Sequence, residues 1–216
     1  TKKLLNEQIK LIIKELEQVE DIAERVELRI EAVQAIYNIS FYNKKAYLSC
    51  GFGVVVIDLI RKEISDVYYL GDNGTYMRIN DIAFTQSDII VATDDGIMYI
   101  DKQNQFPNIV NNWTKDTLSE LAHKQVVDLH VFDNKILAMV ADSSDSNTIY
   151  MGSYDYQFLP WLSGNIKSVE STGKKLVVSE YSKVNIFDNN LSLEAEVEES
   201  NTSWFSMEAT YACLDN

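Results

Sequence analysis

The segment IAFTQSDIIVATDDGIMYID, residues 82–101, decides the fold class. Residues 89–93 and 97–100 are short runs rich in β-branched side chains, and the turn residues Asp94, Asp95 and Gly96 separate them. Glycine tolerates the positive φ that a tight turn requires, so this spacing is typical of a β-hairpin. The segment therefore predicts two antiparallel strands joined by a tight turn.

The same order of strand, polar turn, strand, tight turn and strand occurs four times along the chain. Asp58 and Asp101 close two of the copies and lie 43 residues apart, and Asp188 follows Asp101 after 87 residues, or two such units. The third copy ends on Gly152 in place of the aspartate. Large aromatic residues follow each copy at intervals of 44, 48 and 43 residues: Tyr69, Trp113, Trp161 and Trp204. A repeat of 40–50 residues that holds about four strands is typical of one blade of a β-propeller.

The predicted fold class is therefore mainly β, a partial β-propeller with about four four-stranded blades. Its outer strands are expected at residues 64–69, before Trp113, at 156–159 and at 191–197. The alternative is a β-sandwich, whose strands also recur every 8–12 residues but which needs no period of 43 residues. The final stretch MEATYACLDN, residues 207–216, reads as the opening strands of an incomplete fifth blade. We therefore expect residues 38–216 to be a fragment of a larger propeller.

Residues 1–37 have a different pattern, without Gly or Pro. Their apolar side chains alternate in steps of four and three over more than four heptads: Leu5, Ile9, Ile12, Leu16, Val19, Ala23, Val26, Ile30, Val33 and Tyr37. Such a stripe is typical of a helix that supercoils around a partner. Further apolar residues widen it, so an amphipathic helix packed on its own domain is the alternative. We predict a long N-terminal helix that packs on the propeller, associates with itself or packs on a partner helix.

The composition excludes several classes of protein. The chain has 216 residues, 46% of them hydrophobic, which is too many for a disordered chain. Acidic side chains number 33 and basic ones 19, and the net charge of −14 disfavours binding to nucleic acid. Charged residues interrupt every long apolar stretch, so no membrane-spanning helix is predicted. The two cysteines cannot form a disulfide framework, and no signal peptide is present in these residues.

No catalytic, cofactor or metal site is predicted. The acidic loop at residues 142–147 lacks the glycine and terminal glutamate of a calcium-binding EF-hand. His123 and His130 have no ligand partner at zinc-binding spacing, and Cys50 and Cys213 lie within strand patterns and are expected to be buried thiols. Gly51-Phe52-Gly53 lacks the third glycine of a dinucleotide-binding loop. Carboxylate pairs such as Asp94 and Asp95 fall in turns, so we predict that the chain is not an enzyme.

One stretch resembles a known family. NISFYNKKAYLSCGFGVVVID (residues 38–58), followed by VYYLG (67–71), is similar to the N-terminal propeller of the PorZ-like proteins of the type IX secretion machinery of Bacteroidetes. The likeness continues in shorter strings: NDIAF (80–84), VATDDGI (91–97), NW (112–113), LSL (191–193) and YACLD (211–215). AYLSCGFG (46–53) is its most specific part, whereas Asp-Asp-Gly hairpins occur in many propellers.

The resemblance implies a secreted, non-enzymatic scaffold at the outer membrane or cell surface, or in the periplasm. It also implies protein partners in the complex that attaches cargo to anionic lipopolysaccharide. In this family the lipopolysaccharide contact is ascribed to a C-terminal domain. Residues 38–216 carry 13 basic and 25 acidic groups, which agrees with the absence of an anionic glycan site from this part.

The chain departs from the family at its N-terminus, where further blades are expected in place of the heptad pattern. Either residues 1–37 are an appended or fusion segment, or the architecture differs. A more distant resemblance, to the periplasmic propellers of hybrid two-component regulators, leaves a ligand-sensing module as the alternative function. A propeller hydrolase is a weaker alternative, which requires a convergent pair of carboxylates at the central channel.

Overall fold

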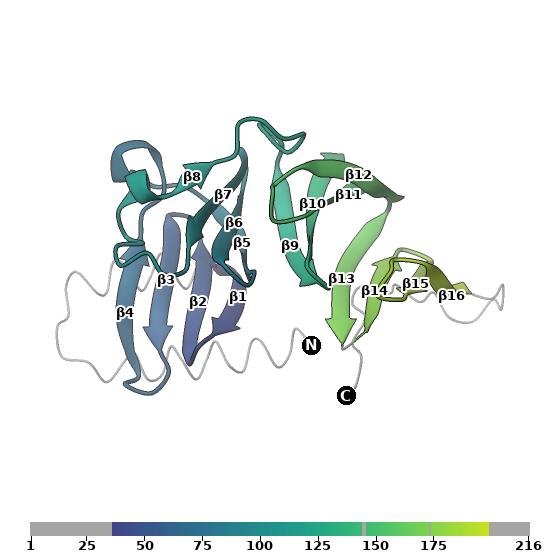
Figure 1. Ribbon diagram of the computed structural model, residues 1–216, viewed down its shortest axis with the longest axis horizontal. Coiled ribbons are helices and arrows are strands. Elements are labelled where there is room, and N and C mark those ends of the chain that lie inside the picture. Colours follow the sequence, from purple (N-terminus) through teal and green to yellow (C-terminus); the bar gives the residue numbers. More distant parts are fainter. Residues whose placement is uncertain (1–35, 144–145, 173, 199–216) are drawn as a thin grey trace. The chain divides into compact units, whose positions relative to one another are not determined.

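The computed structural model describes residues 36–143, 146–172 and 174–198. They form four four-stranded sheets, in each of which the strands lie in chain order (Figure 1). The first two sheets consist of β1 (Ile36–Tyr42), β2 (Lys45–Cys50), β3 (Gly53–Asp58) and β4 (Glu63–Tyr68), then β5 (Ile79–Phe84), β6 (Asp88–Thr93), β7 (Gly96–Asp101) and β8 (Thr114–Lys115). Two 3₁₀ turns accompany them, η1 (Asp72–Gly74) and η2 (Val110–Asn112).

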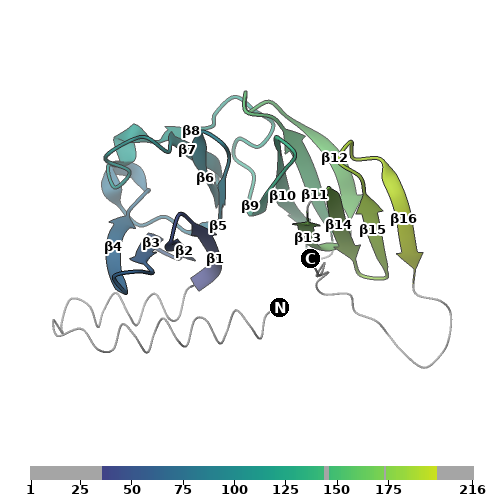
Figure 2. The ribbon, with the colours of Figure 1, turned by 60° about the horizontal axis from the view of Figure 1, so that its bottom comes forward.

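The third and fourth sheets continue the pattern, and the strands of the fourth are seen side by side in Figure 2. They consist of β9 (Val126–Phe132), β10 (Lys135–Ser143), β11 (Ser146–Gly152) and β12 (Phe158–Gly164), then β13 (Ile166–Thr172), β14 (Lys175–Glu180), β15 (Lys183–Phe187) and β16 (Leu193–Glu198). Four separate four-stranded sheets of one topology, rather than the two sheets of a sandwich, are the arrangement expected for propeller blades.

Turn chemistry explains the hairpins. Asn43 and Lys44, between β1 and β2, and Asp133 and Asn134, between β9 and β10, all have positive φ, as the two central residues of a type I′ turn do. Asp94 and Asp95 connect β6 to β7, whose register runs from Thr93↔Gly96 to Asp88↔Asp101. The hairpin predicted from residues 82–101 is therefore confirmed.

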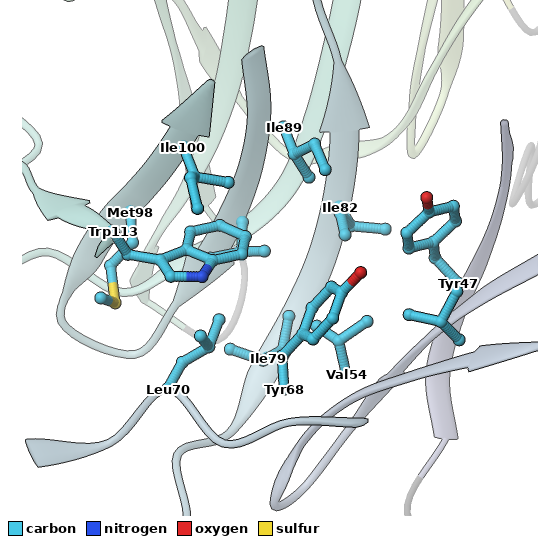
Figure 3. Packing of buried hydrophobic residues seen from close by; sticks show 12 residues of the cluster. Tyr47, Val54, Tyr68, Leu70, Ile79, Ile82, Ile89, Met98, Ile100 and Trp113 are labelled. Atoms are coloured by element: carbon cyan, nitrogen blue, oxygen red, sulfur yellow. The ribbon is translucent and has the colours of Figure 1, made fainter. Parts of the chain in front are cut away.

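The chain divides into two compact units, Thr1–Leu129 and His130–Asn216. In the first unit, the facing sides of the β1–β4 and β5–β8 sheets share one hydrophobic cluster (Figure 3). Figure 3 shows Tyr47 and Trp113 at opposite ends of the cluster, with Tyr68, Val54 and Ile82 between them. The indole N–H of Trp113 donates a hydrogen bond of 2.7 Å to the carbonyl of Pro107. Two sheets that share a core in this way are expected to unfold together.

The apolar run at residues 54–57 follows from burial on both faces of the first sheet. Val54 and Val56 belong to the cluster shared with the second sheet, whereas Val55 and Ile57 belong to a second cluster on the opposite face. All four side chains are buried. A strand buried on both sides reads as a continuous apolar run rather than an alternating one.

The predicted fold class needs correction at its N-terminus. The described residues contain sixteen strands and two 3₁₀ turns but no α-helix, so the fold class as predicted, with a long helix before the propeller, is wrong. Ile36 and Tyr37, assigned to the helix, form the start of β1, where Ile36 pairs with Cys50. Pairing with a neighbouring strand overrides the helical period there, since β-branched and aromatic side chains favour strands. Residues 1–35, and with them the predicted coiled coil, lie outside the described residues.

The outer strands agree in part with the prediction. β4 and β16 lie within a few residues of the predicted ranges 64–69 and 191–197. The strand expected before Trp113 instead follows it, as the two-residue β8, and β12 begins at Phe158 rather than at residue 156. Residues 207–216, predicted to open a fifth blade, lie outside the described residues.

Candidate functional site

Two glycines shape the loops at one end of the first unit. Gly53, which begins β3, has φ +151, and a Cβ there would lie 2.1 Å from the carbonyl oxygen of Tyr68. At Gly71 a Cβ would lie 2.6 Å from the carbonyl oxygen of Thr75, whose oxygen also accepts the Gly71 N–H at 2.9 Å. Only glycine allows these close approaches, so the β2–β3 turn and the β4–β5 loop are held in defined positions.

Three aromatic side chains meet where this turn and this loop come together. The ring centroids of Phe52 and Tyr69, and of Phe52 and Tyr76, are each 6.0 Å apart, and those of Tyr69 and Tyr76 are 5.7 Å apart. Phe52 is buried, whereas Tyr76 is 67% exposed. Phe52 thus supports a tyrosine ring that remains open to solvent.

An arginine that directly precedes β5 makes a separate contact with β1. The guanidinium carbon of Arg78 lies 4.0 Å from the ring centroid of Tyr37, which is 46% exposed. This is the geometry of a cation–π contact, worth about 0.5–1 kcal/mol at an exposed site. We call Tyr37, Phe52, Tyr69, Tyr76 and Arg78 the aromatic surface. Tyrosine and arginine are the side chains enriched at the energetic centres of protein–protein interfaces.

A polar network fixes the neighbouring β6–β7 turn. The Asp95 carboxylate accepts a hydrogen bond from the Lys115 ammonium and lies 2.8 Å from Nδ1 of His123. These two contacts, that of Lys115 first, lower the pKa of Asp95. Asp94 accepts hydrogen bonds from Nδ2 of Asn80 and Nε2 of Gln125. His123, considered above as a zinc ligand, thus orders the loop before β9 through a carboxylate.

A second polar group is buried on the first strands of the blades. Asp81, on β5, is 3% exposed and accepts hydrogen bonds from Nδ2 of Asn38 and from the N–H of Ile82 (2.6 Å) through Oδ1. Its Oδ2 accepts the N–H of Leu129 at 2.8 Å. Burial raises the pKa of Asp81, and the charge of Asp128 raises it further. We call Asn38, Asp81 and Asp128 the buried carboxyl cluster.

A propeller hydrolase would require a convergent pair of carboxylates at the central channel, whereas the buried Asp81 lies between strands. Catalytic carboxylates of glycosidases stand about 5–9 Å apart with room for substrate or water between them. The oxygens of Asp81 are instead occupied by main-chain and amide N–H groups. The arrangement of Asp81 joins strands.

The other residues considered from the sequence have structural positions. Cys50 is buried, as expected, and burial raises the pKa of its thiol to about 12. Nε2 of His130 lies 2.6 Å from Oγ of Ser171, and Asp142 accepts the hydroxyl of Thr148. Cys213 lies outside the described residues.

Neither a metal centre nor a membrane span is found in the described part of the chain. No group of three or more His, Cys, Asp or Glu side chains within residues 36–143, 146–172 and 174–198 could hold a metal ion. Over the same residues, no helix has the length and apolar character that crossing a bilayer requires.

Comparison with known proteins identifies the family. The sequence model described as "TSS9, PorZ, N-terminal beta-propeller domain" matches residues 4–114, which is more than half of the chain. The chain belongs to the PorZ N-terminal β-propeller family. The family resemblance inferred from residues 38–58 is thereby confirmed. No curated protein matches the chain.

Solved structures agree with the PorZ assignment at the level of the fold. PorZ, an essential bacterial surface component of the type IX secretion system of Porphyromonas gingivalis, superposes with a TM-score of 0.63 at 15% identity. The match covers 80% of this chain and 22% of PorZ, so the chain spans about a fifth of that protein's length.

Two structures that contain Nup159 share the fold at lower scores. A chain of the S. cerevisiae Dbp5–Nup159–Gle1 complex gives a TM-score of 0.55 at 14% identity, and the N-terminal domain of Nup159 gives 0.52 at 13%. Both matches cover 77% of this chain and 45% of the other. At such identities the likeness shows a common fold and nothing about function.

Sequence reasoning missed both the buried carboxyl cluster and the aromatic surface of this PorZ-family chain. For the carboxyl cluster a signal existed: Asn38 and Asp81 lie 43 residues apart, and Asp128 follows after 47, each before an apolar residue of a first strand. For the aromatic surface there was none, because Phe52 and Tyr76 meet only through the folding of two loops.

Proposed function

We propose that the chain is the propeller part of a type IX secretion component at the bacterial cell surface. It acts there as a non-enzymatic scaffold that binds other proteins. The observation that carries the proposal is the family match over residues 4–114, together with the description of PorZ as a surface component of that system. An extracytoplasmic location at the outer membrane is part of the same proposal.

The aromatic surface is where we expect a protein partner to bind. Tyr37 and Tyr76 are exposed rings whose positions are fixed, one by Arg78 and the other by Phe52 and Tyr69. Rings held in place lose little conformational entropy on binding, which is why tyrosine contributes strongly to interfaces. Tyr69 and Tyr76 lie in the segment between β4 and β5, and Tyr37 lies near the start of β1.

A scaffold role also fits the chemistry of the site. The buried carboxylate of Asp81 is committed to contacts between strands. The thiol of Cys50 is buried and held protonated by its raised pKa, so it is not a nucleophile. The alternative of a ligand-sensing module of a two-component regulator has no support among the matches described above.

The experiment is affinity capture with outer membranes of a bacterium that has a type IX system. The tagged chain, its Tyr37→Ala/Tyr76→Ala variant and an Ile60→Ala control are incubated with solubilised membranes, and bound proteins are identified by mass spectrometry. Ile60 is 66% exposed and lies in the β3–β4 turn, at the other end of the same blade.

We expect the unchanged chain and the Ile60→Ala control to recover secretion-system proteins. Loss of two interface tyrosines costs about 1–2 kcal/mol each, so the double variant should recover at least about tenfold less. Equal recovery by the double variant would place the binding surface elsewhere. If no secretion-system protein is recovered by any of the three, the proposed function is wrong.

A further inference from the structure

Arg78 is an exposed arginine without an acidic partner in the described part of the chain. The other arginine there, Arg61, lies 3.6 Å from a carboxylate oxygen of Glu63 and 4.0 Å from one of Asp58. Arg78 contacts the Tyr37 ring, and no oxygen among residues 36–143, 146–172 and 174–198 accepts its N–H groups. On a chain with 33 acidic side chains, this arginine is open to a carboxylate from another molecule.

The contact with Tyr37 positions the guanidinium group without using its hydrogen bonds. The guanidinium carbon of Arg78 lies over the ring, 4.0 Å from its centroid. The π face of a ring attracts the cation but is not an oxygen acceptor, so the N–H groups stay available. A guanidinium group can donate two parallel hydrogen bonds to the two oxygens of one carboxylate, and such charge-assisted pairs are stronger than neutral ones. Arg78 is therefore held ready for a carboxylate.

Tyr76 and Arg78 lie on the same side of the segment that leads into β5. Thr75 has extended backbone angles, φ −77 and ψ 175, and β5 begins at Ile79. Met77 and Ile79 pack in the cluster that the first two sheets share, and Figure 3 shows Ile79 within it. Side chains of an extended chain alternate between its two sides, so Tyr76 and Arg78 both point away from this cluster. Both side chains are exposed.

The charge of the chain distinguishes between possible anionic ligands. With 33 acidic and 19 basic side chains, the chain repels a polyanion such as a nucleic acid or an anionic glycan, whose charges repeat along its length. A single carboxylate among apolar side chains avoids most of this repulsion. It can pair with Arg78 while its apolar neighbours contact the rings of Tyr37 and Tyr76. These features fit an acidic side chain on the surface of another protein.

We propose that Arg78 selects the protein partner of the aromatic surface by binding an aspartate or glutamate side chain of that partner. Tyr37 and Tyr76 contact apolar side chains beside this carboxylate. The inference rests on the proposed function, since it names the chemistry of the partner that this surface accepts. Arg78 supplies the selectivity, and the tyrosines supply contact area that does not depend on charge.

The test uses ligands of known structure, so it does not require the identity of the partner. The capped peptide acetyl-Phe-Glu-Phe-amide, its Phe-Gln-Phe twin and glucosyl phosphate are each titrated into the ¹⁵N-labelled full chain. Affinities are measured by NMR for the unchanged chain, Arg78→Gln, Arg78→Lys and the matched control Arg61→Gln. Amide spectra recorded before the titrations establish that each variant is folded.

The glutamate peptide should bind the unchanged chain and Arg61→Gln at least about tenfold more tightly than the glutamine peptide. Arg78→Gln should bind both peptides equally and weakly. Arg78→Lys should keep a smaller preference for glutamate, because an ammonium group retains the charge but not the planar fork of donors. The Nε–H signal of Arg78 should shift with the glutamate peptide.

Three results would overturn the proposal. The first is equal affinity of the two peptides for the unchanged chain, or no binding of the glutamate peptide. The second is a preference for glutamate that persists in Arg78→Gln. The third is tighter binding of glucosyl phosphate than of the glutamate peptide, which would assign Arg78 to an anionic glycan.

The membrane capture experiment separates this inference from the proposed function. Recovery of secretion-system proteins by the unchanged chain and Arg61→Gln, with at least about tenfold less by Arg78→Gln, is the result expected if both are right. Equal recovery by Arg78→Gln contradicts this inference alone. Recovery of no secretion-system protein by any of these chains contradicts the proposed function, whereas the peptide titrations still decide whether Arg78 binds a carboxylate.

Discussion

At the scale of single residues, the aromatic surface depends on backbone positions that only glycine can occupy. Gly53 turns the chain so that Phe52 faces the β4–β5 loop, and Gly71 lets that loop close on Thr75. Neither glycine has a side chain that could contact a partner protein, yet both determine the position of the Tyr76 ring. Such glycines can be recognised in a structure because a Cβ atom added at their position would overlap neighbouring atoms.

Gly53→Ala should destabilise the first unit by about 2–3 kcal/mol, because the new methyl group overlaps the carbonyl of Tyr68 and the backbone keeps a positive φ. Gly74→Ala is the control, since Gly74 has φ +74 but open space around its Cβ position, so only strain of about 1 kcal/mol is expected. Urea unfolding measures both. If the two substitutions lowered the free energy of unfolding equally, the overlap with the Tyr68 carbonyl at Gly53 would contribute nothing to the destabilisation.

Cys50 should be unreactive in the folded protein. Burial raises its pKa to about 12, so the thiolate that attacks thiol reagents is nearly absent at pH 8. In a Cys213→Ser background, which leaves Cys50 as the remaining cysteine, labelling by a maleimide should be at least about a hundredfold slower than in urea. Rapid labelling without denaturant would show that the end of β2 around Cys50 opens readily.

The sequence predicts some residue roles well and others not at all. Asp94, Asp95 and Gly96 could be assigned to a turn because local chemistry determines that structure. Cys50 could be assigned to the interior because its neighbours form a strand pattern. The contacts of Asp81 were missed because they join residues 43 and 48 positions apart, although the repeated polar residue before each first strand carried a signal for them.

At the scale of elements, the first two blades form one cooperative structure. Their shared core contains residues of both sheets, and Tyr68 and Trp113 approach each other within it with ring centroids 6.2 Å apart. Burial on both faces of the first sheet explains its continuous apolar strands. Blades that bury their faces on each other are stable only together.

Ile79→Ala should therefore destabilise both blades. Ile79 is fully buried in the shared cluster, and truncation of such a side chain costs about 3 kcal/mol. Hydrogen exchange should accelerate in β2 and β3 as well as in β6 and β7. Leu118→Ala, at a side chain 90% exposed, should change neither. Acceleration confined to β5–β8 would show that the two sheets unfold independently.

Element prediction succeeded where strands are central and failed at their margins. The inner hairpins follow from period and turn residues, whereas outer strands are short and are shifted by irregular segments, as residues 102–113 before β8 show. The predicted helix extended too far, to Tyr37, because the apolar period alone could not reveal that Ile36 pairs with Cys50 in β2. Pairing partners distant in sequence decide such boundaries.

At the scale of the whole molecule, the 43-residue repeat predicted the propeller architecture, and the family match identified the related proteins. A chain with 33 acidic and 19 basic groups is unsuited to polyanions, and the family match directs attention to protein partners of the secretion system. Neither fact locates the binding surface. That location rests on exposed tyrosines and an arginine held in place by the loops of the first unit.

Site-specific photo-crosslinking tests this central claim most directly. A photoreactive phenylalanine analogue is placed at Tyr76 or, as a control at the other end of the blade, at Ile60, in cells with an active type IX system. The account predicts irradiation-dependent crosslinks from position 76 to an identified secretion-system protein and none from position 60. Crosslinks from position 60 alone, or from neither position, would contradict it.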